Sequence, residues 1–258
     1  NIDAIYISTL NNTHTDLIEK ILKEDKKILC EKPASISLEK LVKIKELIYK
    51  KKTQFYEAIA YYSHPQTLEL LNLINNDEIG EIQKVESNFG FKAKFDPSSR
   101  LFNKSLGGGA VFDLGCYPLS FFMLLTNNPE KITIKSKTLN YTKSDVDDDA
   151  TALLNYDDKF ENKIHVSFKT NLNNICKIYG SKGFIKINEP WLPSKNSTIE
   201  VSSNKHFYIK SINSKLSIYA NQIEKVSQSF INKNTKLNLF NIEKSLINMK
   251  LINCWLND

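Results

Sequence analysis

A carboxylate and a phenol lie four residues apart in a glycine-led segment of this sequence. Residues 107–118 read GGGAVFDLGCYP, which spaces Asp113 and Tyr117 by four positions. The glycines permit a tight turn before a predicted helix, and residues four apart share one helical face. Pro118 is expected to kink this helix just after Tyr117. A carboxylate and a phenol presented together are suited to proton transfer.

A lysine at a predicted strand end could tune that phenol. Residues 27–30 (KILC) predict a short strand, and Glu31-Lys32-Pro33 follows it directly. Open α/β sheets bind ligands at the carboxyl ends of their strands, and Pro33 fixes the backbone beside Lys32. A phenol has an ordinary pKa of about 10, which a neighbouring ammonium would lower. From these residues alone, Lys32 could equally be a surface lysine, and Tyr117 a packed residue whose hydroxyl Asp113 satisfies.

The elements that must position these residues begin as an alternation of strands and helices. Strands are predicted over residues 2–8, 27–30 and 54–60, and amphipathic helices over 15–23 and 37–50, the second capped by Ser37. A βαβαβ run predicts a parallel sheet with right-handed crossovers.

The pattern changes near residue 61. A helix is predicted from His64-Pro65 through residue 74, a long strand over 81–94 and a helix over 107–125. Strands dominate residues 131–187, with turn signals that suit an antiparallel or mixed sheet, and a helical tail spans 218–256. The expected fold class is therefore an α/β part followed by an α+β part.

Composition excludes several classes of protein. Apolar residues make up 41% and charged residues 25%, as in soluble globular proteins, and the longest apolar stretch, residues 119–125, is far shorter than a membrane span. The net charge of +6 comes from lysines interleaved with acids, so neither nucleic acid nor membrane is an expected partner.

Four widely spaced cysteines predict no metal site and a reducing, cytoplasmic location. Cys116 is expected to be a packed small residue instead of a nucleophile.

Several motifs in order resemble the Gfo/Idh/MocA oxidoreductase family, within it the branch of glucose–fructose oxidoreductase and dimeric dihydrodiol dehydrogenase. One motif such as Glu-Lys-Pro is weak, but seven in the correct order and spacing are strong. They are IDAIYISTLN with His14 (residues 2–14), CEKP (30–33), EA to HP (57–65), IGE (79–81), FGF (89–91), FDPSSRLF (95–102) and residues 107–118.

The resemblance implies hydride transfer between a nicotinamide cofactor, NAD or NADP, and a hydroxyl- or carbonyl-bearing carbon of a sugar or cyclic diol. Lys32 and Tyr117 match the family's lysine and its catalytic acid/base, and Asp113 matches an acid that helps to hold substrate hydroxyls. The positions that match cofactor-lining residues are Ser8, Thr9, Asn11, His14, Glu31, Lys32 and Pro33.

The resemblance also implies two domains. Residues 1–60 would be the C-terminal part of a Rossmann-type dinucleotide-binding domain, with an incomplete parallel sheet. Residues 61–258 would form an α+β domain for substrate binding and dimerisation, whose large sheet makes a homo-oligomer. Since the family's GxGxxG turn has no match here, we expect either a fragment or a shortened homologue whose exposed edge strand a partner covers.

Two alternatives stay open. A non-catalytic binding or scaffold homologue could have lost its dinucleotide loop, and a nucleotide-sugar dehydrogenase is the other enzyme considered. Tyr62 stands where the family usually has arginine, which leaves the substrate contacts open, and Tyr61 is placed with the substrate or entrance residues. Arg100 is the single arginine of the chain. Because its planar fork is something lysine cannot replace, it is expected to pair with a carboxylate or backbone carbonyls near the entrance.

Overall fold

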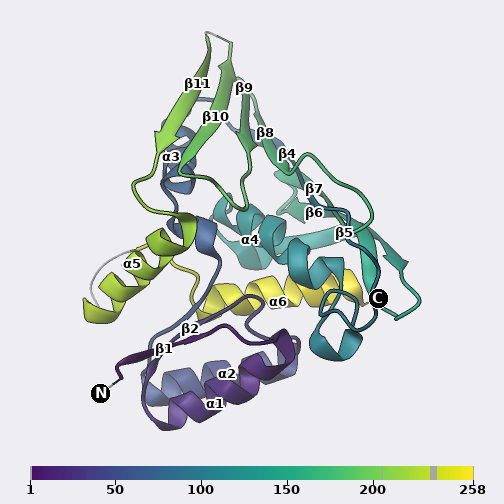
Figure 1. Ribbon diagram of the computed structural model, residues 1–258. Helices are drawn as coiled ribbons and strands as arrows, with labels where there is room; N and C mark the ends of the chain where they lie inside the picture. The colour runs from purple at the N-terminus through teal and green to yellow at the C-terminus, as the bar shows by residue number, and fades with distance from the viewer. Residues whose placement is uncertain (1, 205, 233–236, 258) are drawn as a thin grey trace.

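The computed structural model describes residues 2–204, 206–232 and 237–257 and contains two sheets. The first is a parallel sheet in the order β1 (Ala4–Ile7), β2 (Lys27–Cys30), β3 (Phe55–Glu57). The crossovers are α1 (His14–Lys23) and α2 (Leu38–Lys51), which lie together below the sheet in Figure 1. This is the predicted βαβαβ arrangement.

Local sequence explains the helix α2. The Ser37 side chain accepts a hydrogen bond from the Lys40 amide at 3.3 Å, which satisfies a free donor of the first turn. Leu41, Ile44 and Ile48 are buried at helical spacing. The N-cap and the apolar face are those that the sequence predicts.

The second sheet has eight strands in the order β11-β10-β9-β8-β4-β7-β6-β5 and is mixed, because β4 and β7 pair in parallel while its other pairs are antiparallel. Its fold class is as predicted, but the sequence did not anticipate the hairpin of β10 and β11. The strands are β4 (Ile82–Gly90), β5 (Ile132–Tyr141), β6 (Asp147–Tyr156), β7 (Phe160–Ser167), β8 (Ile175–Gly180), β9 (Gly183–Asn188), β10 (Asn196–Ser203) and β11 (Phe207–Asn213).

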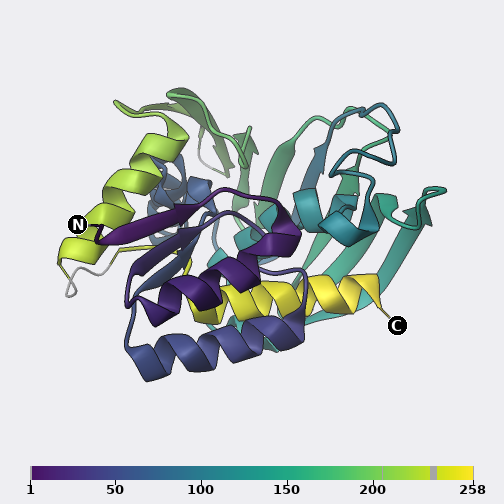
Figure 2. The same ribbon diagram turned by 60° about the horizontal axis from the view of Figure 1, so that its bottom comes forward.

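The helical tail consists of two helices, α5 (Ile218–Ile231) and α6 (Ile242–Leu256). The helix α6 lies between the two sheets, where it contacts α2 and β3 on one side and α4 (Cys116–Leu124) and β5 on the other (Figure 2). Trp255 of α6 is fully buried and donates from its indole nitrogen to the Thr151 carbonyl at 3.0 Å. A further helix, α3 (Pro65–Asn75), packs against β10 and β11. No helix in the described residues is long and apolar enough to span a membrane.

The predicted helix over residues 107–125 is irregular at a different place from the one expected. A π-helical turn spans Val111–Gly115 and leads into α4, which runs through Pro118 without ending. Proline lacks an amide proton and would clash with the carbonyl four residues earlier in a regular helix. The wide turn comes just before it, so the irregularity lies ahead of Tyr117, and the kink expected just after that residue stays a prediction.

Candidate active site

A cavity of about 550 Å³ lies at the carboxyl ends of β1 and β2, between the two sheets. Its polar lining includes Glu31, Lys32, Arg100, Asp113 and Tyr117. Apolar and aromatic side chains form the remaining walls, among them Phe89, Phe91, Leu192 and Ile223. A cavity of this size, mostly apolar with a few convergent polar groups, is typical of a small-molecule site.

Lys32 is held by the helix that carries Tyr117. Its ammonium donates to the Asp113 carbonyl at 2.7 Å and to the Asp113 carboxylate at 3.0 Å. The Nζ atom lies 4.9 Å from the centroid of the Tyr117 ring, within the range of a cation–π contact. Of the three residues that the sequence proposed for chemistry, Lys32 therefore contacts both of the others.

Asp113 is shared by two cations. Arg100 donates from Nη1 to the same carboxylate oxygen at 2.8 Å, which is the carboxylate pairing expected for the single arginine. Burial alone would raise the pKa of Asp113, but Lys32 and Arg100 outweigh it and hold the pKa of that carboxyl below its ordinary value. Asp113 is therefore an anion at neutral pH.

The electrostatics of Tyr117 differ from the expectation. Burial raises the pKa of the Tyr117 phenol, and the Lys32 ammonium offsets only part of this effect. Burial also opposes the charged form of Lys32, yet Tyr117 and Asp113 outweigh it and raise the pKa of that ammonium. The predicted lowering of the Tyr117 pKa is thus wrong for the free protein, because desolvation exceeds the effect of one cation. The phenol is protonated at neutral pH and can act as a proton donor.

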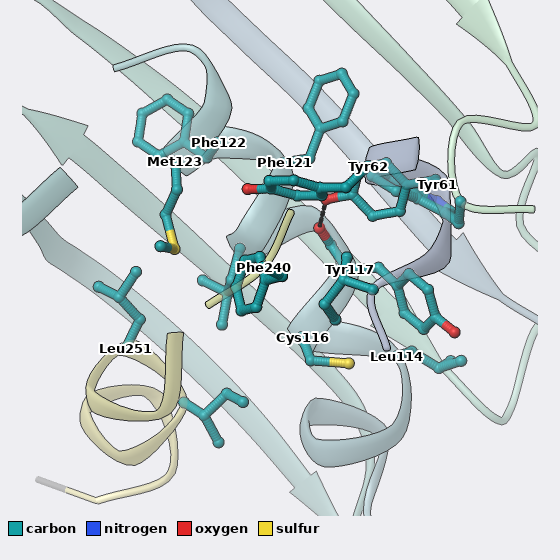
Figure 3. Close-up of a cluster of buried hydrophobic side chains, with 14 of the residues drawn as sticks. Tyr61, Tyr62, Leu114, Cys116, Tyr117, Phe121, Phe122, Met123, Phe240 and Leu251 are labelled. Carbon is teal, nitrogen blue, oxygen red and sulfur yellow. Dashed lines mark hydrogen bonds between the residues drawn. The ribbon is translucent and has the colours of Figure 1, made fainter. Parts of the chain in front are cut away.

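The aromatic cluster beneath Tyr117 contains residues that the sequence placed elsewhere. Tyr61 is fully buried, and its hydroxyl donates to the Tyr117 carbonyl at 3.2 Å, so it lies under the site and not at the entrance. Tyr62 is a core residue whose hydroxyl donates to the Ser120 carbonyl at 2.7 Å. The Tyr61 ring lies next to those of Tyr62 and Phe121, and Figure 3 shows the Tyr117 hydroxyl pointing away from this cluster. Cys116 is buried there, and burial raises the pKa of its thiol to about 12, as suits a packed residue.

Of the residues expected to line a cofactor, Glu31 and Lys32 line the cavity. Glu31 accepts hydrogen bonds from the Tyr6 hydroxyl and from the Lys32 amide, the latter at 3.2 Å. Ser8 and Thr9 lie exposed in the loop after β1. Their contact with a cofactor stays a prediction.

The other residues expected to line a cofactor join loops of the protein. His14 is buried, with ring nitrogens 2.8 Å from the Pro33 carbonyl and 3.1 Å from the Thr9 carbonyl. Asn11 donates to the Gly107 carbonyl at 3.3 Å, and the Lys32–Pro33 peptide bond is cis. These bonds connect the loop after β1 with the turn after β2 and with the glycine turn.

Sequence reasoning missed one wall of the cavity. Tyr6 of β1 and Tyr219, Gln222 and Ile223 of α5 line it. Tyr219 and Gln222 lie three residues apart in a segment already expected to be helical, but nothing local shows that this helix returns to the first sheet. Phe230 of α5 stacks on Tyr56 of β3 with ring centroids 5.6 Å apart, which seats the helix there.

Comparisons with protein families divide the chain as its two sheets do. Residues 1–59 match the profile described as oxidoreductase family, NAD-binding Rossmann fold, and residues 67–186 match the GFO/IDH/MocA C-terminal domain. The chain belongs to the Gfo/Idh/MocA family. This confirms the resemblance drawn from the motifs.

Curated relatives of this Gfo/Idh/MocA chain include dehydrogenases. Trans-1,2-dihydrobenzene-1,2-diol dehydrogenase of Xenopus tropicalis is 30% identical over 200 residues, which cover 75% of this chain and 58% of the relative. D-xylose 1-dehydrogenase (NADP(+)) 2 of Haloferax volcanii is 26% identical over 188 residues, covering 73% and 57%. The chain thus spans little more than half the length of these relatives.

Solved structures share the fold. A 3-ketoreductase from Actinomadura kijaniata in complex with NADP and TDP-benzene superposes with a TM-score of 0.87 at 20% identity, covering 97% of this chain and 76% of that one. Aldose-aldose oxidoreductase from Caulobacter crescentus, complexed with glycerol, gives a TM-score of 0.87 at 18% identity, covering 97% and 75%.

The described residues fit the nicotinamide end of a dinucleotide. Glu31 and Lys32 lie at the carboxyl end of β2, and the aromatic rings of Tyr6 and Tyr219 line the same cavity. The turns that follow β1 and β2 contain no glycine, so neither forms the glycine-rich phosphate turn of a dinucleotide fold. Within the described residues the fit is therefore to the reactive end of the cofactor.

Proposed function

We propose that this chain acts as an NAD(P)-dependent oxidoreductase. The reaction transfers a hydride between nicotinamide and a hydroxyl- or carbonyl-bearing carbon of a sugar or cyclic diol. The observation that carries the proposal is the convergence of Lys32, Asp113 and Tyr117 in one cavity. Lys32 is fixed by two bonds to Asp113, and its charge lies 4.9 Å from the centre of the Tyr117 ring. Such an arrangement suits a proton transfer that accompanies a redox step.

Each residue would have a distinct task. Bound nicotinamide supplies the hydride chemistry, for which the protein provides position and electrostatics. Tyr117, protonated in the free protein, would donate its phenol proton to a substrate carbonyl oxygen and take it back in the reverse direction. Lys32 would stabilise the phenolate left behind, because an adjacent cation favours the anionic form. Asp113 would keep Lys32 charged and in place, and Arg100 would complete the polar wall.

The named relatives support the substrate class. The curated relatives include a diol dehydrogenase and a D-xylose dehydrogenase, both of which oxidise a carbon that bears a hydroxyl group. The cavity combines charged groups with apolar walls, which matches a ring that carries neighbouring hydroxyls. NAD and NADP are both kept in the proposal.

Cofactor binding and turnover test the proposal separately. NADH and NADPH are titrated into the protein by nucleotide fluorescence, and D-xylose, D-glucose and trans-1,2-dihydrobenzene-1,2-diol are assayed as substrates. Tyr117→Phe should lower kcat by about 10²–10⁴-fold while nucleotide binding is kept. The matched control is Tyr179→Phe on the second sheet, where the hydroxyl bonds Glu86 at 2.9 Å. Binding of neither nucleotide would favour the scaffold homologue, and unchanged kcat in Tyr117→Phe would refute the assigned chemistry.

A homo-oligomer formed through the second sheet is part of the proposal. On β4, Val85 and Phe89 face the core, while Lys84 and Glu86 alternate with them and face outward. The Lys177 ammonium lies 3.9 Å from the centroid of the Phe184 ring on the neighbouring strands β8 and β9. Light scattering tests this: a monomer at micromolar concentration would contradict it. A cytoplasmic location is also kept, supported by four free cysteines.

A further inference from the structure

A buried carboxylate lies directly behind the turn that carries Lys32. Glu57, at the end of β3, is 4% exposed, and its Oε1 atom accepts a hydrogen bond from the Ala34 amide at 3.1 Å. Ala34 follows Lys32 and Pro33 in the same turn. Lys32 extends from this turn to Asp113, so the carboxylate of Glu57 bonds the backbone from which the lysine extends.

The helix α6 reaches both halves of the catalytic pair. Ser245 lies beside Glu57, where its hydroxyl donates to the Asn241 carbonyl at 3.1 Å, and Asn248, three residues later on the same face, donates to the Cys116 carbonyl at 3.2 Å. Cys116 directly precedes Tyr117. Both Ser245 and Asn248 are buried, so α6 packs against the carboxylate behind Lys32 and bonds the turn of Tyr117 with side chains that lie outside the cavity.

We propose that Glu57 is a positioning residue that fixes Lys32 against Tyr117, with Asn248 holding the Tyr117 side of the pair. The proposal rests on the proposed function, because the pair it positions is the proposed catalytic pair. Neither Glu57 nor Asn248 lines the cavity, so both act through the backbone of other residues. Catalytic groups need this support, because a misplacement of about 1 Å can cost about 10²-fold in rate.

Because Glu57 can lose its charge, its positioning of Lys32 should depend on pH. Burial raises the pKa of Glu57 to about 7, while the nearby Ser245 hydroxyl and the bond from the Ala34 amide oppose the rise. The titratable groups that interact with it are Cys30, Glu31, Lys32, Tyr62 and Cys116. Lys32 lowers the pKa of Glu57, so by reciprocity an ionised Glu57 favours the charged form of Lys32.

The hydrogen bond can be observed without any catalysis. Labelling with ¹⁵N-alanine gives nine backbone signals, among them Ala34 and Ala110. The Ala34 signal should move with pH, with a midpoint near 7, and Glu57→Gln should abolish that movement while keeping an oxygen acceptor. Ala110 is an internal control, because it directly precedes Val111, whose amide donates to the Asp147 carboxylate at 2.7 Å. Burial raises the pKa of Asp147 to about 6, and the response of the Ala110 signal to this titration should survive in Glu57→Gln. An Ala34 signal that does not titrate, or that titrates unchanged in the variant, would overturn the proposal.

The effect on Lys32 is measured by peptide-resolved acetylation at pH 8. Glu57→Gln removes a negative charge near Lys32, so the acetylation rate of Lys32 should rise about tenfold for each unit by which its pKa falls. The exposed Lys40 serves as the reference lysine. An unchanged rate ratio between Lys32 and Lys40 would count against the proposed coupling.

Turnover supplies the last measurement. Glu57→Leu should lower kcat by about 10-fold or more with little change in KM, Glu57→Gln should recover part of it, and Asn248→Leu should resemble Glu57→Leu. Equal kcat in all variants, alongside the expected spectra, would refute the positioning role. Failure of the proposed function looks different: nucleotide binding and turnover are then absent in the unaltered protein, while the Ala34 and Lys32 measurements still test the positioning.

Discussion

Replacement of Asp113 by asparagine removes the charge that Lys32 and Arg100 share. The carboxylate lies 3.0 Å from the Lys32 ammonium, and the two side chains are only 9% and 13% exposed. At an effective dielectric constant of about 20, unit charges at this distance attract by about 5 kcal/mol, and removal of one partner of a buried pair typically costs about 3–5 kcal/mol. Because Lys32 keeps its bond to the Asp113 carbonyl, we expect a loss near the lower end, about 3 kcal/mol.

The pH dependence of this loss follows from the two shifted pKa values. Asp113 has a lowered pKa when folded, so its contribution is complete above the ordinary carboxyl pKa of 3.8 and is lost as pH falls through the folded pKa. Lys32 has a raised pKa, so its contribution is complete below 10.5 and is lost as pH rises through the folded pKa. The difference between the two proteins should therefore be constant across neutral pH and shrink in acid.

Urea unfolding followed by circular dichroism at pH 7 and pH 3 measures this difference. Asp145→Asn is the matched control. It removes a carboxylate from an ion pair with Lys104, in which the side chains of Lys104 and Asp145 are 70% and 72% exposed. That control should change the free energy of unfolding far less. If Asp113→Asn unfolded at the same urea concentration as the unaltered protein at pH 7, the assignment of Asp113 as the counterion of a buried lysine would be wrong.

Three further predictions concern the surroundings of the cavity. Arg100→Lys should reduce kcat/KM for a hydroxyl-bearing substrate by about 10-fold, because lysine cannot reproduce the planar fork that reaches Asp113; an equal kcat/KM would contradict this. Gly109→Ala should destabilise the fold by about 2 kcal/mol or more in urea titrations, because Gly109 has a φ of +121° and an added Cβ would lie 2.3 Å from the Asp147 carboxylate. An unchanged urea midpoint would mean that this backbone relaxes freely. Burial raises the pKa of Asp147 to about 6. Its contribution to the free energy of unfolding is therefore complete below pH 3.8 and is lost as the pH rises through 6, and this loss amounts to at most about 3 kcal/mol. Asp147→Asn should remove that loss, so that its stability relative to the unaltered protein rises between pH 4 and pH 7.

Local patterns identified most of the first sheet and the polar core of the site. The strand over residues 27–30 and the cap at Ser37 follow from nearest neighbours in sequence, whereas the ion pair between Lys32 and Asp113 was not predicted. The strand and the cap are determined by interactions within a short segment of the chain. The roles proposed for Lys32, Asp113 and Tyr117 still await the measurements above.

Features that depend on distant segments could not be predicted. The strand β11 lies at the edge of its sheet and leaves Phe207 and Ile209 more than half exposed, so its sequence lacks the burial pattern of a strand. The raised pKa of Tyr117 depends on how completely other elements enclose it, which its own segment does not show. The same holds for the wall of α5, whose Tyr219 lies far along the chain from Tyr6.

The place of α6 has a consequence for how the molecule is made. The bond between Asn248 and the Cys116 carbonyl closes a loop of 132 residues, and the indole of Trp255 bonds a carbonyl 104 residues earlier. Contacts of such long range form slowly, because closing the loop costs conformational entropy before the contact contributes any favourable free energy. During synthesis, β2 and α4 leave the ribosome well before the helix that joins them. Lys32 and Tyr117 therefore reach their final geometry only after nearly all of this chain has been translated.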